Sequence, residues 1–282
     1  DLWFSNQNVA TTAYGHIRDW NTSAVTDMSN AFQDRATFNE NISGWNVGNV
    51  SNMSHMFRNS TTFNQNISTW NTSSVTDMGW MFSAATSFNQ PIGNWDVSAV
   101  SSMGHMFRGA SAFNQPIANW DTSAVIDMRF MIRDASSFNQ NVYDWNVSIV
   151  IRMDGMFMGS TSISNLNKGE IHKAFSTNPN WTTDWSEFVV YEPISDAKFQ
   201  DAVNLWFSDE VNATALYGHI SDWNVTAVTN MSHAFYNRTN FNENITSWDV
   251  SNVSIMAGIF RNAQNFNQPI GDWNISSVSS TT

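Results

Sequence analysis

One tryptophan recurs every 25 residues, and this spacing constrains the fold more than any other feature of the chain. Counted from that tryptophan, Val follows at +5, Met at +8, usually Phe at +12, and Phe-Asn at +18 and +19. The ladder comprises Trp20, Trp45, Trp70, Trp95, Trp120, Trp145, Trp223, Trp248 and Trp273. One such repeat cannot bury its own apolar face, whereas stacked repeats align identical side chains in continuous inner rows. The spacing therefore predicts a solenoid in which each repeat is one coil and the ladder tryptophans are buried.

Two segments of each repeat differ in their local pattern. The Phe-Asn-Gln-x-Ile segment, for example residues 88–92, is short and bounded by Asn, Pro and Gly, which favours a strand. The segment Val-x-x-Met-x-x-Met-Phe, for example residues 100–107, has the three-to-four-residue spacing of a helical turn. The pattern predicts an α/β solenoid similar to leucine-rich repeats, with one parallel strand and one helical turn per coil. Its coils would stack about 4.8 Å apart.

A second period of 203 residues lies above the first. Residues 1–40 and 204–243 are identical at 24 of 40 positions, including Tyr-Gly-His-Ile at 14–17 and 217–220. We therefore predict two domains. The first covers 1–188, with a partial N-cap at 1–19, six repeats at 20–159 and a C-cap at 160–188. A linker at 189–194 leads to an incomplete second domain at 195–282, with an N-cap at 195–222 and repeats at 223–282.

The segments that interrupt the 25-residue rhythm favour helical caps between domains. Residues 165–175 predict a short helix with Leu166, Ile171 and Phe175 on one side, and residues 195–206 predict a second helix capped by Ser195. Residues 1–5 match only the last part of that second helix, so we expect the sequence to start within a domain.

The repeat is similar to that of a known family. Residues 94–117, Asn-Trp-Asp-Val-Ser-Ala-Val-Ser-Ser-Met-Gly-His-Met-Phe-Arg-Gly-Ala-Ser-Ala-Phe-Asn-Gln-Pro-Ile, resemble the repeat of BspA-like leucine-rich bacterial surface proteins. The resemblance covers nearly all of 20–160 and 220–282. It implies a secreted or cell-surface solenoid used in adhesion or protein contact, with no catalytic residues to transfer.

Composition excludes several classes of partner and chemistry. A net charge of −12 with only 12 Lys and Arg argues against nucleic acid, whose phosphates need clusters of basic side chains. The chain has no Cys, which removes disulfides and thiolate chemistry. No run of 18 apolar residues predicts a membrane span. Because no catalytic triad, carboxylate pair or phosphate-binding loop stands out, we predict no enzyme activity, no metal and no cofactor.

The few candidate polar sites have ordinary structural interpretations. His55, His105 and His233 share the +10 position, but neighbouring coils carry Asn30, Trp80 and Phe130 there, so a packing role is favoured over a metal site. His16 and His219 belong to the repeated Tyr-Gly-His-Ile motif, where a structural role is also favoured. Asp96, Asp121 and Asp249 follow ladder tryptophans and could contribute to calcium binding, although the repeat itself requires no ion there. A functional face is expected at the variable positions Arg58, Arg108, Arg133 and Tyr236.

Acceptor sequences for N-glycosylation are unusually dense. There are 16 Asn-x-Ser/Thr sites, which either carry glycans or arise because Trp-Asn-x-Ser is part of the repeat. The candidate asparagines are Asn21, Asn41, Asn49, Asn52, Asn59, Asn66, Asn71, Asn146, Asn180, Asn212, Asn224, Asn230, Asn237, Asn244, Asn252 and Asn274.

Two functions remain in play for an extracellular or surface protein of this kind. In the first, tandem 203-residue domains join end to end with copies of themselves and assemble into a fibre or filament. In the second, the chain is an adhesin-like module that binds a protein or glycan through one face of the solenoid. The 203-residue repetition favours the first.

Overall fold

The computed structural model describes residues 2–280 and divides the chain into two compact units, Asp1–Val189 and Val190–Thr282. Each unit has its own buried core and is described by itself. The last two residues of the predicted second domain, 281 and 282, lie outside the described residues.

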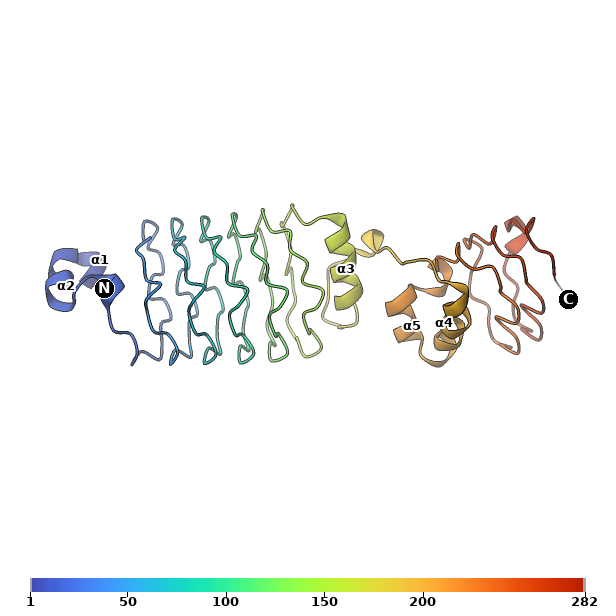
Figure 1. The fold of residues 1–282 in the computed structure, drawn as a ribbon, viewed down its shortest axis with the longest axis horizontal. Helices are drawn as coiled ribbons and strands as arrows, with labels where there is room; N and C mark the ends of the chain where they lie inside the picture. Colours follow the sequence, from blue (N-terminus) through green and yellow to red (C-terminus); the bar gives the residue numbers. More distant parts are fainter. Residues whose placement is uncertain (1, 281–282) are drawn as a thin grey trace. The chain divides into compact units, whose positions relative to one another are not determined.

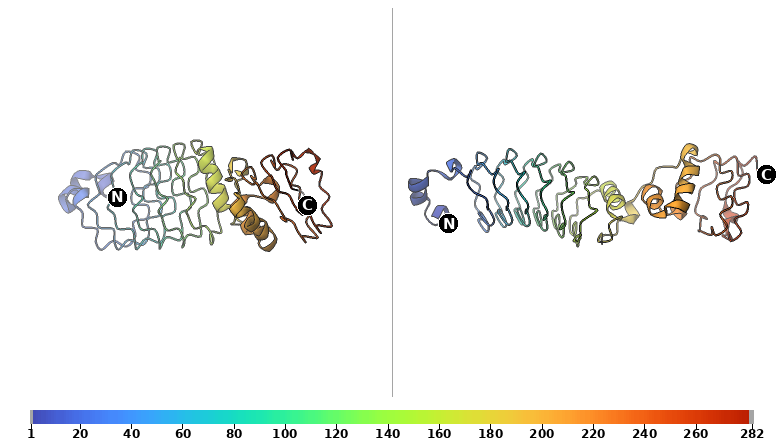
Figure 2. Two further views of the ribbon diagram at one scale, coloured as in Figure 1. Left: turned by 45° about the vertical axis from the view of Figure 1, so that its right-hand side comes forward. Right: turned by 90° about the horizontal axis from the view of Figure 1, so that it is seen from below.

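The first unit is a stack of six coils with helices at both ends (Figure 1). At its N-terminal end lie α1 (Leu2–Ser5), α2 (Gln7–Tyr14) and the 3-10 turn η1 (Ile17–Asp19). Coils 1 to 6 begin at the ladder tryptophans from Trp20 to Trp145, and further views show the same parallel stack (Figure 2). The C-terminal end is formed by α3 (Asn165–Phe175) and η2 (Ser186–Phe188).

The prediction of an α/β solenoid with a parallel strand in each coil is wrong. Residues 2–280 contain no strand, and neighbouring coils share only isolated parallel bridges at +7, such as Asp27 with Asn52 and Asp127 with Arg152. In the segment expected to be a strand, side chains replace the backbone ladder: Asn64 N–H donates to Asn39 Oδ1 at 2.9 Å. Pro91 and Pro116 stand within the same segment of two coils and have no N–H to donate.

The helical turn expected around the methionines is also absent. Residues +8 to +14 form consecutive four-residue turns, and alternate N–H groups leave the coil for the next one. In coil 1, Met28 N–H donates to Asn52 O at 2.9 Å and Phe32 N–H to Met56 O at 2.8 Å, while Ala31 N–H closes its own turn on Met28 O. This arrangement satisfies the backbone in a stack without strands or helices.

The turns require left-handed backbone at two positions of each coil. Positive φ recurs at +10 and +14, for example 59° at both Asn30 and Asp34 in coil 1 and 61° and 55° at Trp80 and Ala84 in coil 3. Glycine, asparagine and aspartate tolerate this region best, and coil 6 has Gly155 and Gly159 there. A residue with a larger side chain at either position must be compensated by its contacts.

Inside the coils, the ladder tryptophans pack and bond from coil to coil. Seven of the nine are buried, whereas Trp20 and Trp273 are partly buried. Each indole N–H from Trp45 to Trp145 donates to the backbone carbonyl of the isoleucine that stands three residues before the preceding ladder tryptophan, at 2.9–3.3 Å. Trp20 has no coil before it and donates to Gly15 O at 3.1 Å, at the end of α2. The cap therefore replaces the missing coil.

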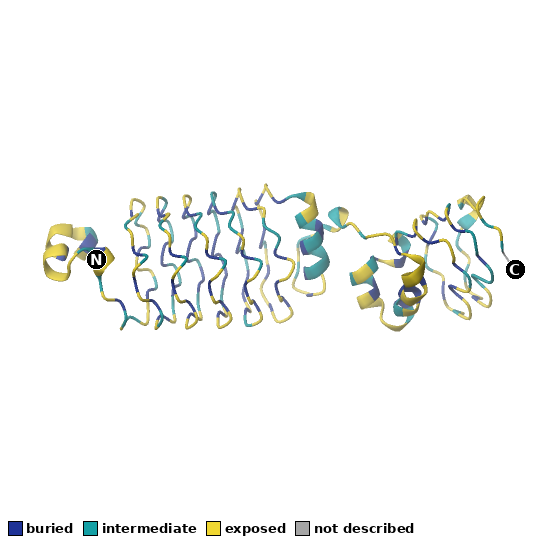
Figure 3. Ribbon diagram, in the orientation of Figure 1, coloured by how far each residue is buried: buried dark blue, intermediate teal, exposed yellow. Residues whose placement is uncertain are grey.

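Phenylalanines fill the rest of the core. Within a coil the +12 and +18 rings stack at 3.9 Å, as in Phe57 and Phe63, and between coils the +12 rings stack at 5.5 Å, as in Phe57 and Phe82. The continuous buried interior is visible in Figure 3. Helix α3 closes it with Ile171 and Phe175, which are fully buried, whereas Leu166, predicted on the same side of the helix, is 66% exposed.

The second unit repeats this plan, with α4 (Asp196–Ser208), α5 (Glu210–Tyr217), η3 (Ile220–Asp222) and coils that begin at Trp223, Trp248 and Trp273. A further 3-10 turn, η4, spans Ile270–Asp272. Asp196 at the start of α4 accepts hydrogen bonds from the N–H groups of Thr229 and Asn230 at 2.6 and 3.0 Å. These N–H groups lie on the side of the first coil where, in later coils, a preceding coil would be bonded. Across residues 2–280, no helix is both long and apolar enough to cross a membrane.

The left-handed positions allow a test with neighbouring alanines. Ala84 has φ 55°, whereas Ala85 beside it is fully buried and lacks positive φ. We expect Ala84→Gly to raise the free energy of unfolding by about 0.5 kcal/mol, because relief of left-handed strain exceeds the added entropy of the unfolded chain. Ala85→Gly should lower it by about 1–2 kcal/mol through lost packing and chain entropy. Urea denaturation measures both, and equal destabilisation by the two variants would contradict the turn geometry.

Candidate functional site

The four-residue turns at +8 to +14 of successive coils lie one above another, and we call this row of turns the turn ladder. The variable positions predicted to form a functional face lie on its outer side. The guanidinium carbon of Arg58 is 4.9 Å from the centre of the Trp80 ring, that of Arg108 is 5.7 Å from the same ring, and Arg133 lies 5.2 Å from the ring of Phe130. Contacts at these distances are favourable cation–π interactions. In the second unit, Tyr236 is 40% exposed. It lies under Arg261 at 5.8 Å.

The rings beneath these arginines form a stack along the +10 position of successive coils. We call His55, Trp80, His105 and Phe130 the ring column. Their centroids are 5.7, 3.7 and 5.0 Å apart in that order. All four residues have positive φ, from 52° at Phe130 to 61° at Trp80. Contacts with the neighbouring rings, on both sides for Trp80 and His105 and on one side for His55 and Phe130, compensate for placing bulky rings in the left-handed region. Gly155 leaves space for Phe130 in the next coil.

His105 is the most enclosed member of the ring column. The residue is 8% exposed, and its Nδ1 is buried without a hydrogen-bond partner. Burial, followed by the charges of Arg108 and Arg129, lowers the pKa of this imidazole from its usual 6.5 to about 4. Burial and Arg58 also lower the pKa of His55. Both rings are therefore neutral at pH 7 and pack as aromatic side chains.

A charged cluster that sequence reasoning missed lies next to the ring column. Asp127 is 7% exposed, and its Oδ2 lies 3.2 Å from both Arg129 Nε and Arg152 Nη1. Asp127 Oδ1 also accepts a hydrogen bond from Arg129 N–H at 3.1 Å. The only signal in the sequence is that basic residues appear at +7 and +9 of coils 6 and 5, where other coils carry neutral or acidic side chains. The cluster links coil 5 to coil 6, because Asp127 pairs with Arg129 of its own coil and with Arg152 of the next.

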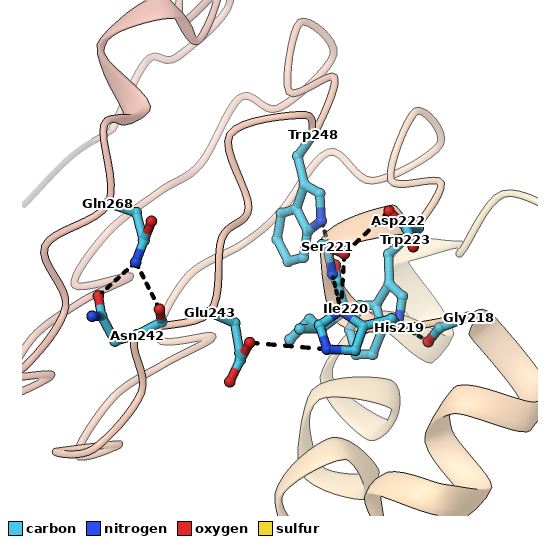
Figure 4. Close-up of polar contacts among 10 residues, drawn as sticks. All are labelled: Gly218, His219, Ile220, Ser221, Asp222, Trp223, Asn242, Glu243, Trp248 and Gln268. Atoms are coloured by element: carbon cyan, nitrogen blue, oxygen red, sulfur yellow. Dashed lines mark hydrogen bonds and ion pairs between the residues drawn. The ribbon is translucent and has the colours of Figure 1, made fainter.

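The repeated cap histidines occupy equivalent environments. In the second unit, His219 Nδ1 accepts from Ser221 N–H at 3.3 Å, and Nε2 lies 3.9 Å from Glu243 Oε2 (Figure 4). The ring also packs edge-on against Trp206. In the first unit, His16 accepts from Arg18 N–H at 3.3 Å and lies 3.8 Å from Glu40.

Ser221 Oγ also lies 2.8 Å from His219 Nδ1, which places a serine, a histidine and a glutamate together. Three facts assign this group to structure. Nδ1 already accepts a backbone N–H, the serine hydroxyl also contacts Asp222 Oδ1 at 3.1 Å, and Arg18 replaces the serine in the other unit. What the two units share is a histidine that caps a 3-10 turn. Figure 4 also shows the side-chain amide of Gln268 donating to the backbone carbonyl of Asn242, one of the bonds that Asn and Gln side chains make from coil to coil.

The recurrent aspartates close turns. Asp96 Oδ1 accepts from the Ser98 hydroxyl at 2.6 Å and from its N–H at 3.0 Å, and these bonds hold the pKa of Asp96 below its usual value. Asp121 and Asp249 accept the N–H two residues on in the same way. Within the described part of the chain, no three His, Asp or Glu side chains are grouped as metal ligands. The chemistry of these aspartates is that of turn formation.

The asparagines of the glycosylation sequences all lie among the described residues, and none is buried. Several use only Oδ1, which accepts the N–H two residues on: Asn21, Asn41, Asn66, Asn71, Asn146, Asn224, Asn230, Asn244 and Asn274. Others donate their side-chain N–H to a neighbouring group, namely Asn49, Asn52, Asn59, Asn180, Asn212 and Asn252. A glycan on Nδ2 would disturb the second set and leave the bonds of the first intact.

A shallow hollow recurs between the N-terminal cap and the first coil of each unit, with volumes of about 450 and 420 Å³. Arg35 stacks on Phe4 at 4.2 Å in one copy, and Arg238 stacks on Phe207 at 4.3 Å in the other. The linings have the same formal charge but place it differently, because Gln7 is replaced by Glu210 and Asp34 by Asn237 in the second copy. The recurrence therefore follows from the shared fold, and a common ligand is not required to explain it.

Stacked coils with a shared inner ladder and separate caps define a repeat-solenoid protein. A family described as "Mycoplasma protein of unknown function, DUF285" matches residues 3–107, 90–184 and 198–282. The chain belongs to this family. No curated protein and no solved structure matches it.

His105 gives a measurable pH dependence. Its folded pKa of about 4 lies below the 6.5 of the unfolded chain, so its contribution to stability is present above pH 6.5 and is lost as the pH falls towards 4. A shift of this size corresponds to about 3 kcal/mol. His105→Asn preserves the left-handed backbone, as Asn30 does in coil 1. Between pH 7 and pH 4.5, the variant should lose about 2–3 kcal/mol less unfolding free energy than the wild type. Identical losses in urea denaturation would show that His105 is not the titrating group.

Proposed function

We propose that this chain is a non-catalytic, extracellular structural repeat protein whose 203-residue solenoid domains are joined in tandem and assemble into a surface fibre. The observation that carries the proposal is the repetition of a complete plan: each unit has its own core and begins with the same helical cap followed by coils. The Trp3 and Trp206 rings pack on equivalent histidines at 5.0 and 4.9 Å. Such modules can be added in series, because each coil contacts only its neighbours.

A structural role also agrees with what the polar side chains do. His219 caps a turn, His105 packs in a ring column, and Asp96 closes a turn, so each is occupied by the fold itself. The resemblance to BspA-like repeats supports the surface location. The coil-to-coil hydrogen bonds of the turn ladder supply the stiffness that a fibre needs.

Electron microscopy of the native protein tests the fibre. We expect threads whose axial period equals the length of one 203-residue domain, because the cap and coil plan recurs at that interval. Image averaging measures the period. Dispersed rods at high protein concentration, without any thread, would contradict the proposal.

A second candidate function is binding of an acidic glycan or an acidic protein segment by the ring column face. The specific observation is that Arg58 and Arg108 flank Trp80 without a carboxylate partner among the ion pairs of the described residues, in a chain with net charge −12. Guanidinium groups match carboxylates and sulfates with two parallel hydrogen bonds. The faces of Trp80 are covered by the two histidines, so the arginines and the ring edges would make the contacts.

Charge-matched variants test this second function. We expect the wild type to be retained on an immobilised acidic polysaccharide at low salt, and Arg58→Gln/Arg108→Gln to lose that retention. Arg18→Gln/Lys198→Gln changes the net charge equally at exposed positions in the N-terminal caps of the two units and should be retained as the wild type is. Equal behaviour of the two double variants would remove the ring column face as a binding site.

A further inference from the structure

The exposed apolar side chains in the coils of the first unit are confined to its last two coils. Among the described residues of coils 1 to 6, the large apolar side chains classed as exposed are Ile126, Tyr143, Ile149, Ile151 and Met158. All of them follow Trp120. Coils 1 to 4 have the same backbone and the same inner ladder, so the difference is one of surface chemistry and not of fold.

The internal repeat shows what the isoleucines replace. At +6, coils 1 to 4 carry Thr26, Ser51, Thr76 and Ser101, and the second unit carries Thr229, Ser254 and Ser279. Each of the three hydroxyls in coils 2 to 4 donates to the +6 carbonyl of the coil before, at 3.1–3.2 Å. Coils 5 and 6 keep the backbone bonds, with Ile126 N–H on Ser101 O and Ile151 N–H on Ile126 O, but have lost the hydroxyl row.

This exchange is unfavourable for an isolated molecule in water. Two hydroxyl hydrogen bonds are given up, and β-branched apolar side chains are left 43% and 60% exposed in adjacent coils. Ile149, two residues before Ile151, is a further 48% exposed. We call Ile126, Ile149 and Ile151 the isoleucine patch. Contiguous exposed apolar side chains in a soluble domain mark an interaction surface.

The charges beside the isoleucine patch indicate what covers it. Asp127 follows Ile126 in the chain and Arg152 follows Ile151, and both join Arg129 in the charged cluster. Asp127 is buried between these arginines, so the exposed charges of the rim are the two basic side chains, Arg129 and Arg152, and the acidic Asp154. Most of the surface of a chain with net charge −12 repels a second copy, whereas a rim with both signs is self-complementary.

We propose that the isoleucine patch is a lateral contact between two copies of this chain, packed about a two-fold axis with the isoleucines at the centre and Arg129, Arg152 and Asp154 at the rim. A two-fold contact uses the same patch on both copies and stops at two. Three side chains cover far less than the roughly 800 Å² per partner of a stable complex, so the dimer is weak and forms at high concentration. The contact is independent of the end-to-end assembly proposed above.

Sedimentation equilibrium of the full chain tests the contact, over roughly 10 μM to 1 mM, a range that brackets weak dissociation constants. The wild type should pair laterally, so that at saturation its average mass is about twice that of a variant without the isoleucine patch at the same concentration. Ile126→Thr/Ile151→Thr places at +6 the residue that coils 1 and 3 carry, so the thermal midpoint should be unchanged while the dissociation constant rises about tenfold or more. Val211→Thr removes a still more exposed apolar side chain from α5 and should dimerise as the wild type does.

The outcomes separate this contact from other associations. A wild type that stays monomeric throughout the range overturns the proposal and assigns the isoleucine patch to a different molecule. Dimerisation that survives the double variant overturns it as well. Association that grows beyond two chains and is insensitive to the isoleucines is end-to-end assembly, which supports the fibre and contradicts the lateral contact.

Discussion

The hydrogen bonding of one coil to the next along the turn ladder is the constraint on which the rest of the structure depends. Alternate N–H groups between +8 and +14 leave each coil, as Met28 and Phe32 show in coil 1, and this alternation requires positive φ at +10 and +14. In coils 1 to 6 the side chains at +8 and +12 are thereby directed into the core, whereas those at +10 and +13 lie on the other side, where only His105 and Ser83 are buried. The hydrogen bonding of the backbone thus decides which side chains are left on the surface that could bind a partner.

The ends of a stack need separate solutions, and both units use similar ones. The indole N–H of a first-coil tryptophan, Trp20 or Trp223, bonds to the glycine that ends the preceding cap helix, at 3.1 and 2.9 Å. In the first unit, Asn178 supplies donors to the Val147 and Val150 carbonyls of the last coil. Caps that bond to a coil in the manner of another coil reduce the number of open backbone groups at the end of a solenoid.

Function in such a molecule resides in departures from the repeat. Positions that all coils share are occupied by packing and by coil-to-coil bonds, so they carry little information about partners. The arginines over Trp80 and the isoleucines of coils 5 and 6 depart from the residues of neighbouring coils without changing the backbone. The repeat supplies internal controls for both, because another coil shows which residue the fold alone would accept.

The sequence by itself determined the stack, its 25-residue period and the inward side chains, because identical residues at a fixed interval can only be buried together by piling up. Only the tertiary structure decided the backbone within a coil. Phe-Asn-Gln-x-Ile has the local pattern of a strand, yet Asn39 Oδ1 takes the place of a backbone acceptor, and the methionine segment turns repeatedly instead of forming a helix. The same applies to the ring column and to the Asp127 cluster. Their members are about 25 residues apart in the chain, and contact between them arises from stacking, which no local propensity encodes.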